Sequence, residues 1–93
     1  MATSRPIAAM RNLGPATARM LAEIDIRSEQ DLRALGAVGA FARLRFACIP
    51  GLSLNALYAM HAALNDIHWR AMSADAKASL RSEVERALEP IPL

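Results

Sequence analysis

At residues 10–18 the sequence reads Met10-Arg11-Asn12-Leu13-Gly14-Pro15-Ala16-Thr17-Ala18, and this stretch decides the fold. A short apolar run precedes it. Asn12 and Gly14 end that run, because both residue types tolerate the left-handed backbone of a tight turn. Pro15 follows where a new helix would begin, at the first helical position, where its missing N–H is no loss. The stretch therefore predicts a helix, a hairpin turn and a second helix.

The spacing of this hairpin resembles that of the helix-hairpin-helix family, whose turn runs Gly, apolar residue, Gly and, after three more residues, Ala. Asn12 stands in place of the first Gly, and Leu13 is the apolar plug. Gly14 is the second Gly, and Ala18 is the small residue that lets the two helices pack closely. The resemblance implies that the hairpin N–H groups and the next helix N-terminus face a DNA phosphate. A helix N-terminus suits an anion, because its N–H groups are unpaired and its dipole end is positive.

The candidate nucleic-acid-binding residues are those of the hairpin and its flanking arginines: Arg11, Asn12, Leu13, Gly14, Ala16, Thr17 and Arg19. The N–H groups expected at the phosphate are those of Leu13, Gly14 and Ala16. Arg11 and Arg19 would flank the same phosphate, adding affinity without base specificity. The alternative is a purely structural hairpin that packs two helices, with both arginines on a solvated, mildly basic face.

Length and composition predict one domain over residues 1–93, with a core at about 6–89. Hydrophobic residues make up 54% of the chain and aromatic residues only 4%. Much of the apolar fraction is Ala, the best helix former. We therefore expect thin, closely packed helices that leave some apolar surface for a partner protein or a second copy of the chain.

The basic residues are nearly all arginine, since Lys77 is the only lysine among eleven. Residues 1–50 hold seven arginines and four acidic residues, a net charge of +3, whereas residues 51–93 have a net charge of −1. The half that contains the hairpin is the basic one, which weakly favours a polyanionic partner. The sequence leaves open whether Arg43 and Arg45 extend this basic surface or face away from it.

Apolar spacing, caps and breakers predict short helices over residues 6–11, 15–23, 29–35, 38–47, 54–65 and 74–88. Ser28, Ser53 and Ser73 are the expected N-caps, and Gly36 is the expected C-cap of the third helix. No segment has the alternating pattern of a strand. The fold class is therefore predicted to be all-α, a compact bundle of five or six short helices.

Beyond the hairpin, a distinctive series of segments follows in order: Ile24-Asp25-Ile26, Leu32-Arg33-Ala34-Leu35-Gly36-Ala37-Val38, Phe41-Ala42-Arg43-Leu44-Arg45, Ser53-Leu54-Asn55-Ala56-Leu57-Tyr58-Ala59-Met60 and His68-Trp69. The series resembles the C-terminal domain of the TfoX/Sxy competence regulators over about residues 8–72. The resemblance implies a SAM-like helical domain with helix-hairpin-helix-like elements. Full-length members are bacterial regulators that promote expression of DNA-uptake genes with the cyclic-AMP receptor protein. Because Met1 lies just ahead of the hairpin, without the family's N-terminal α/β domain, we expect a stand-alone C-terminal domain.

Several functional classes find no support in the sequence. A single cysteine, Cys48, excludes an internal disulfide and suits a cytoplasmic protein, and its place on an apolar helix face predicts a buried, inert thiol. No segment is long and apolar enough for a membrane helix. His61, Asn65 and His68 share a helical spacing, but no close pair of ligands accompanies them. We expect no metal, cofactor, small-molecule substrate or enzymatic activity.

The sequence thus predicts a small regulatory or adaptor domain that binds DNA through its hairpin, without sequence specificity. The alternative is a protein–protein interaction module, binding a regulatory protein or a second copy, in which the hairpin is only structural. Salt separates the two, because phosphate contacts weaken steeply as salt rises and an apolar interface does not.

Overall fold

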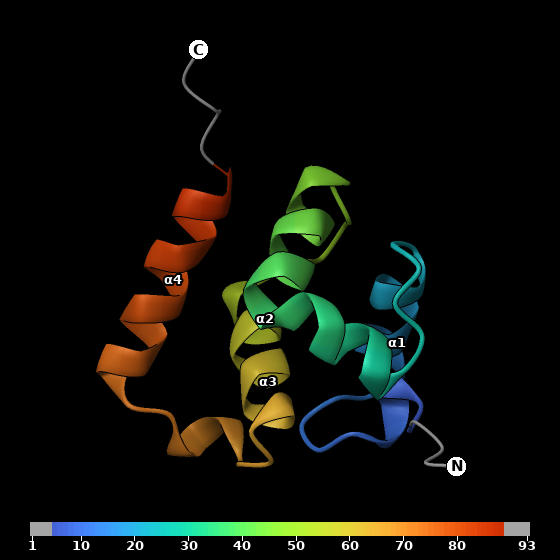
Figure 1. Ribbon diagram of the computed structural model, residues 1–93, viewed down its shortest axis with the longest axis horizontal. Coiled ribbons are helices and arrows are strands. Elements are labelled where there is room, and N and C mark those ends of the chain that lie inside the picture. Colours follow the sequence, from blue (N-terminus) through green and yellow to red (C-terminus); the bar gives the residue numbers. More distant parts are fainter. Residues whose placement is uncertain (1–4, 89–93) are drawn as a thin grey trace.

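The computed structural model describes residues 5–88, which form four α-helices, two 3-10 helices and no strand. These are η1 (Ile7–Ala9), α1 (Pro15–Ala22), α2 (Glu29–Phe46), α3 (Leu54–Leu64), η2 (Trp69–Ala71) and α4 (Ala74–Leu88). Figure 1 shows α2 and α3 in the middle of the molecule, with α4 on one side and α1 on the other. The predicted all-α class is confirmed for these residues.

The expected number of five or six short helices is not matched, for two reasons. The first predicted helix is only the 3-10 turn Ile7–Ala9, because Met10 leaves it with an extended backbone. The third and fourth predicted helices join as one bent element, α2, with the bend at Gly36. Gly36 has φ 80° and ψ 162°, a conformation open essentially to glycine alone, so the chain changes direction there without a connecting loop.

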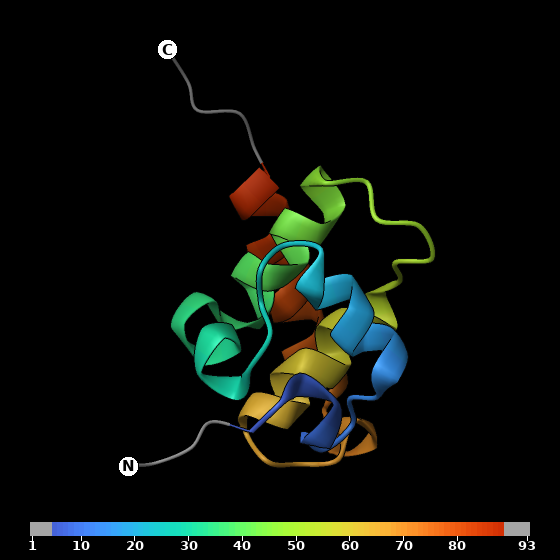
Figure 2. The ribbon, with the colours of Figure 1, turned by 90° about the vertical axis from the view of Figure 1, so that its right-hand side faces the viewer.

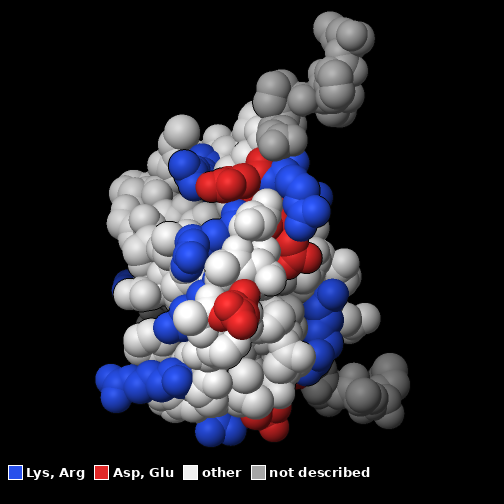
Figure 3. Space-filling view, turned by 90° about the vertical axis from the view of Figure 1, so that its left-hand side faces the viewer, with Lys and Arg blue, Asp and Glu red and all other residues white. Residues whose placement is uncertain are grey.

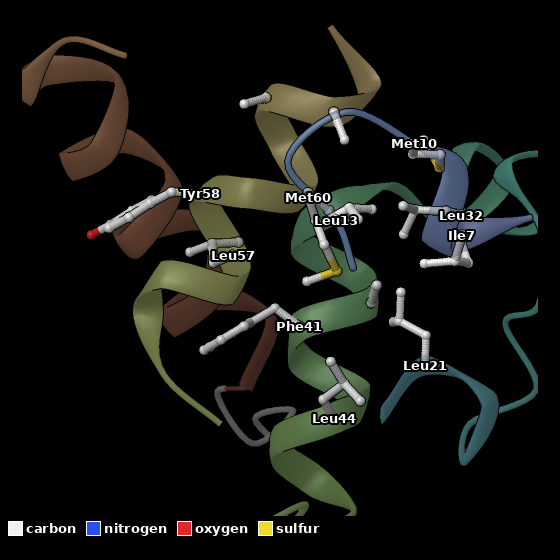
Figure 4. Close-up of a cluster of buried hydrophobic side chains, with 14 of the residues drawn as sticks. Ile7, Met10, Leu13, Leu21, Leu32, Phe41, Leu44, Leu57, Tyr58 and Met60 are labelled. Carbon is white, nitrogen blue, oxygen red and sulfur yellow. The ribbon is translucent and has the colours of Figure 1, made fainter. Parts of the chain in front are cut away.

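The N-terminal segment and the four helices share one hydrophobic core (Figure 4). Its largest fully buried side chains are Ile7, Leu21, Leu32, Leu44, Leu57 and Met60. Small residues of α2 and α3 are buried among them, namely Ala37, Ala40, Ala62 and Ala63. Because Ala side chains are short, these two helices approach closely, as the Ala-rich composition predicts. The core also includes Met10 and Leu13, so the hairpin is packed against the domain.

Two of the three predicted serine caps are confirmed. The Ser28 hydroxyl accepts a hydrogen bond from the N–H of Asp31, and the Ser73 hydroxyl accepts one from the N–H of Ala76, at 3.3 and 3.1 Å. Ser53 precedes α3, but its side chain makes no capping hydrogen bond. Each of these three residues therefore begins a helix as predicted, and two satisfy an otherwise unpaired N–H group there.

Three helices end with the same local motif. The residues with positive φ at these ends are Asp25, Cys48 and Asp66, and an isoleucine follows each of them. The N–H groups of these isoleucines donate to carbonyls five residues earlier, as in a Schellman motif: Ile26 to Leu21, Ile49 to Leu44 and Ile67 to Ala62. The motif turns the chain off the helix where a glycine is more usual.

This motif corrects the prediction of a buried thiol. Helical spacing places Cys48 on the apolar face of Phe41 and Leu44 only if the helix continues to residue 48. The helix ends at Phe46 and Cys48 adopts φ 57°, so the helical spacing that groups it with Phe41 and Leu44 does not apply. Cys48 is exposed, whereas Phe41 and Leu44 are buried.

Candidate nucleic-acid interface

The predicted hairpin lies between η1 and α1 at the lower end of the molecule (Figures 1 and 2). Its tip is closed by a hydrogen bond of 3.1 Å from the N–H of Leu13 to the carbonyl of Met10. The Leu13 side chain is only 7% exposed and acts as the apolar plug. Because the backbone N–H of Leu13 is bonded to Met10 within the turn, the expectation that this N–H group faces a phosphate is corrected.

Asn12 joins the hairpin to the loop between α3 and η2. Its side-chain Nδ2 donates to the carbonyl of Ile67 at 2.6 Å, and its Oδ1 accepts from the backbone N–H of Trp69 at 3.2 Å. The residue has φ 70°, a left-handed conformation that Asn and Gly tolerate best. Asn12 therefore takes the place of the first Gly of the helix-hairpin-helix turn without losing the turn. It adds two hydrogen bonds that Gly cannot make.

Arg11 strengthens the same connection. Its Nη1 donates to the carbonyl of Asp66 at 3.2 Å, directly before the carbonyl that Asn12 contacts. Three hydrogen bonds, two donated by Arg11 and Asn12 and one accepted by Asn12, thus fix the hairpin against residues 66–69. Arg11 remains exposed, so one of its guanidinium nitrogens is held while the group still faces solvent.

The start of α1 is an open helix N-terminus. Gly14 is the N-cap residue, no side chain caps the helix, and its first turn holds no acidic residue. A Cβ built on Gly14 would meet no atom within 4 Å, so the approach to this helix end is clear. Ala16 is exposed and Thr17 half-buried at the second and third helical positions, where N–H groups lack a partner within the helix.

Arg19 is exposed four residues after Pro15, which places it on the same side of α1 one turn later. The structure thus places Gly14, Ala16 and Thr17 at the start of α1 and Arg19 in its last turn. Asn12 and Leu13 have a different role, because the side chains of both stabilise the fold.

Two other arginines of the basic half are committed to an acidic partner. Glu29 bonds to Arg5 at 2.9 Å and to Arg33 at 2.8 Å. Hydrogen bonds from Arg5 and then Arg33 lower the pKa of the Glu29 carboxyl from 4.5 to about 2. Arg33 also donates to the carbonyl of Leu64 at 3.1 Å, which ties the start of α2 to the end of α3. These two arginines share a single acidic partner, so the three side chains together keep a net charge of +1.

Arg43 and Arg45 do not extend the hairpin surface. Both lie near the C-terminal end of α2, at the end of the molecule away from the hairpin (Figure 1), and they line two separate grooves. The face over α4 carries basic and acidic side chains side by side (Figure 3). The charges of that helix are Asp75, Lys77, Arg81, Glu83, Glu85 and Arg86. Helix α4 therefore carries as many acidic as basic side chains.

Sequence reasoning missed a second surface feature. Phe46, the last residue of α2, is 87% exposed beside an apolar groove of about 540 Å³. Helical spacing groups Phe41 with Leu44 but says nothing of a neighbouring aromatic residue off that face. The sequence pattern offers no signal that identifies it.

Within residues 5–88, no group of three or more His, Cys, Asp or Glu side chains could hold a metal ion. None of the helices described there has the length and apolarity needed to cross a membrane. His61 bonds to Asn65, and the His68 ring accepts from the N–H of Arg70 at 3.1 Å. Each histidine thus has a local structural contact.

Comparison with known proteins identifies the family of this chain. No curated protein matches the chain. The crystal structure of an uncharacterized protein from Listeria monocytogenes, in a triclinic form, has a similar fold, with a TM-score of 0.76 and 21% sequence identity. The match covers 88% of this chain and 92% of that one. The family model of the TfoX C-terminal domain matches residues 3–84, and the chain therefore belongs to the TfoX C-terminal domain family.

Proposed function

We propose that this chain is a small non-enzymatic regulatory or adaptor domain that binds the DNA backbone, without sequence specificity, through the start of α1. The observation that carries the proposal is the open N-terminus of α1, with no capping side chain, no acidic first-turn residue and free space beside Gly14. Unpaired N–H groups and the positive dipole end suit a phosphate oxygen there. Membership in the TfoX C-terminal domain family supports the regulatory part of the proposal.

The surrounding contacts support phosphate binding in two ways. Arg19 supplies a positive charge one turn along the helix, and Arg11 supplies another at the hairpin. The hydrogen bonds of Asn12 hold the hairpin in place before any ligand arrives, which lowers the ordering cost of binding. Both features add affinity for any phosphate backbone and read no base.

The sharpest test places a new carboxylate at this helix end. Ala16→Glu adds an acidic side chain at the second position of α1, where it favours the helix by about 0.3–1 kcal/mol but repels phosphate. Asn55→Glu is the matched control, because it adds the same charge at the second position of α3, whose first turn also lacks an acidic residue. Affinity for a fluorescently labelled duplex is measured by anisotropy at low salt, and stability by thermal unfolding.

Ala16→Glu is expected to weaken duplex binding about tenfold more than Asn55→Glu, a difference of about 1.4 kcal/mol. Neither variant should lower the unfolding temperature, since both residues face solvent in the first turn of a helix. Equal affinity of the two variants would contradict a phosphate contact at the start of α1.

The alternative function is a protein-interaction module. One observation favours it, the exposure of Phe46 beside an apolar groove, since aromatic residues are enriched at protein–protein interfaces. Binding through that surface would hold or tighten as salt rises, whereas duplex binding through α1 would weaken.

A further inference from the structure

The apolar groove at the C-terminal end of α2 is built from three parts of the chain. Ile24 and Asp25 come from the turn after α1, Ala42 to Ala47 from α2, and Ala87 and Leu88 from α4. Figures 1 and 2 show the C-terminal ends of α2 and α4 side by side, at the end of the molecule opposite the hairpin. A molecule bound in this groove would therefore not cover the hairpin.

The groove has a projecting aromatic side chain on one side and an apolar hollow that fits such a side chain on the other. Phe46 stands on its rim with 87% of its surface in water. The adjoining walls are apolar and largely small, formed by Ile24, Ala42, Ala47, Ala87 and Leu88. An aromatic side chain fits such a wall well, but Phe46 does not fold back onto its own. The same patch therefore offers what a copy of itself would need.

The polar residues of the groove are also complementary to one another. Asp25 and Arg43 are the only charged residues that line it. Asp25 contacts Arg27 at 3.3 Å, but the two side chains are 91% and 69% exposed, so this weak pair leaves the carboxylate accessible. Arg43 is exposed and forms no ion pair within residues 5–88. When two copies meet about a two-fold axis, the acid of each copy can pair with the base of the other.

We propose that the chain forms a two-fold symmetric homodimer through this groove. In the dimer, Phe46 of each copy packs into the groove of the other, and Arg43 of each copy approaches Asp25 of the other. A two-fold interface requires a surface that matches itself, and a patch with one aromatic projection, one apolar hollow, one acid and one base meets that requirement. A nucleic acid is the poorer occupant, because the lining is mainly apolar and contributes a single basic group.

The test is the molecular mass of the chain in solution, measured by sedimentation equilibrium from about 10 µM to about 1 mM, the range that detects weak interfaces. Phe46→Glu removes the aromatic projection. Leu54→Glu is the matched control, because Leu54 is also an exposed apolar side chain, at 40%, and lies outside this groove. Circular dichroism and thermal unfolding confirm that both variants keep the fold.

The wild-type mass should rise from monomer to dimer with concentration, and Phe46→Glu should raise the dissociation constant at least about tenfold. Leu54→Glu should match the wild type. Arg43→Glu should also weaken the dimer, because two acids then face each other, and adding Asp25→Asn to it should restore part of the affinity. A wild-type chain that stays monomeric throughout, or a dimer that Phe46→Glu and Leu54→Glu affect equally, would overturn the proposal.

Discussion

Asn12 is the residue on which the position of the hairpin depends, and its replacement tests that dependence. Asn12→Ala removes the hydrogen bonds to Ile67 and Trp69 and also forces a Cβ residue into φ 70° without a polar side chain. Asn12→Gly removes the same two hydrogen bonds but relieves the backbone, because glycine adopts positive φ freely. Comparing the two variants therefore separates the stability that the hydrogen bonds contribute from the cost of the left-handed backbone conformation.

The magnitudes follow from these two contributions. Each hydrogen bond contributes about 0.5–1.5 kcal/mol to stability, so Asn12→Gly should cost about 1–3 kcal/mol. The left-handed conformation adds about 1 kcal/mol for alanine, so Asn12→Ala should cost about 2–4 kcal/mol. The expected order of stability is therefore wild type, then Asn12→Gly, then Asn12→Ala.

The assay is urea unfolding followed by circular dichroism, with the free energy of unfolding obtained by linear extrapolation. Asn55→Ala is the control, since Asn55 is an exposed asparagine in the first turn of α3, and it should change the free energy by less than about 0.5 kcal/mol. The reasoning is refuted if Asn12→Ala and Asn12→Gly are both within about 0.5 kcal/mol of the wild type.

Two further predictions concern the bend in α2 and the ion pairs at its start. Gly36→Ala should destabilise the fold by about 1–3 kcal/mol, because φ 80° with ψ 162° strains any side chain, while Gly14→Ala, at φ −134° with open space beside it, should cost less in the same thermal unfolding series. Glu29 has a folded-state pKa of about 2 against an ordinary 4.5, so its contribution to stability is complete above pH 4.5 and is lost as pH falls toward 2. The stability gap between wild type and Glu29→Gln should therefore shrink over that pH range, and a gap that stays constant in acid would show that the bonds to Arg5 and Arg33 do not stabilise the fold.

Local signals in the sequence were sufficient to predict most of the helices. Pro15 begins α1 and Ser73 precedes α4 as predicted, since proline and serine act through their own backbone neighbours. The predicted range 74–88 is the observed extent of α4. The helical class also follows from such signals, because no segment alternates between apolar and polar residues.

The errors arise where tertiary packing or a special backbone conformation decides. The first apolar run is too short for an α-helix, and docking of Ile7 in the core leaves it as a 3-10 turn. Gly36 does interrupt the helix as predicted, since its φ and ψ lie outside the helical region, but no loop separates the two halves. Cys48 leaves the helical face because the helix ends two residues earlier.

The candidate site shows the same division. The hairpin and the Gly14-Pro15 start of α1 are visible in the sequence, because turn and helix-start residues are local signals. The contact between Asn12 and Ile67 spans 55 residues, so no local pattern reveals it. The commitment of the Leu13 N–H to the turn likewise needs coordinates. The phosphate site that we propose therefore comprises the start of α1 with Arg19 and Arg11.

The most direct test of phosphate binding is the salt dependence of duplex affinity, measured by fluorescence anisotropy with the wild-type chain. If two or three phosphates are contacted, the logarithm of the association constant should fall with the logarithm of salt concentration at a slope of about −2 to −3. Duplexes of unrelated sequence should give the same slope, because the contacts read no bases. An absence of binding at low salt, or an affinity that does not fall as salt rises, would contradict the account.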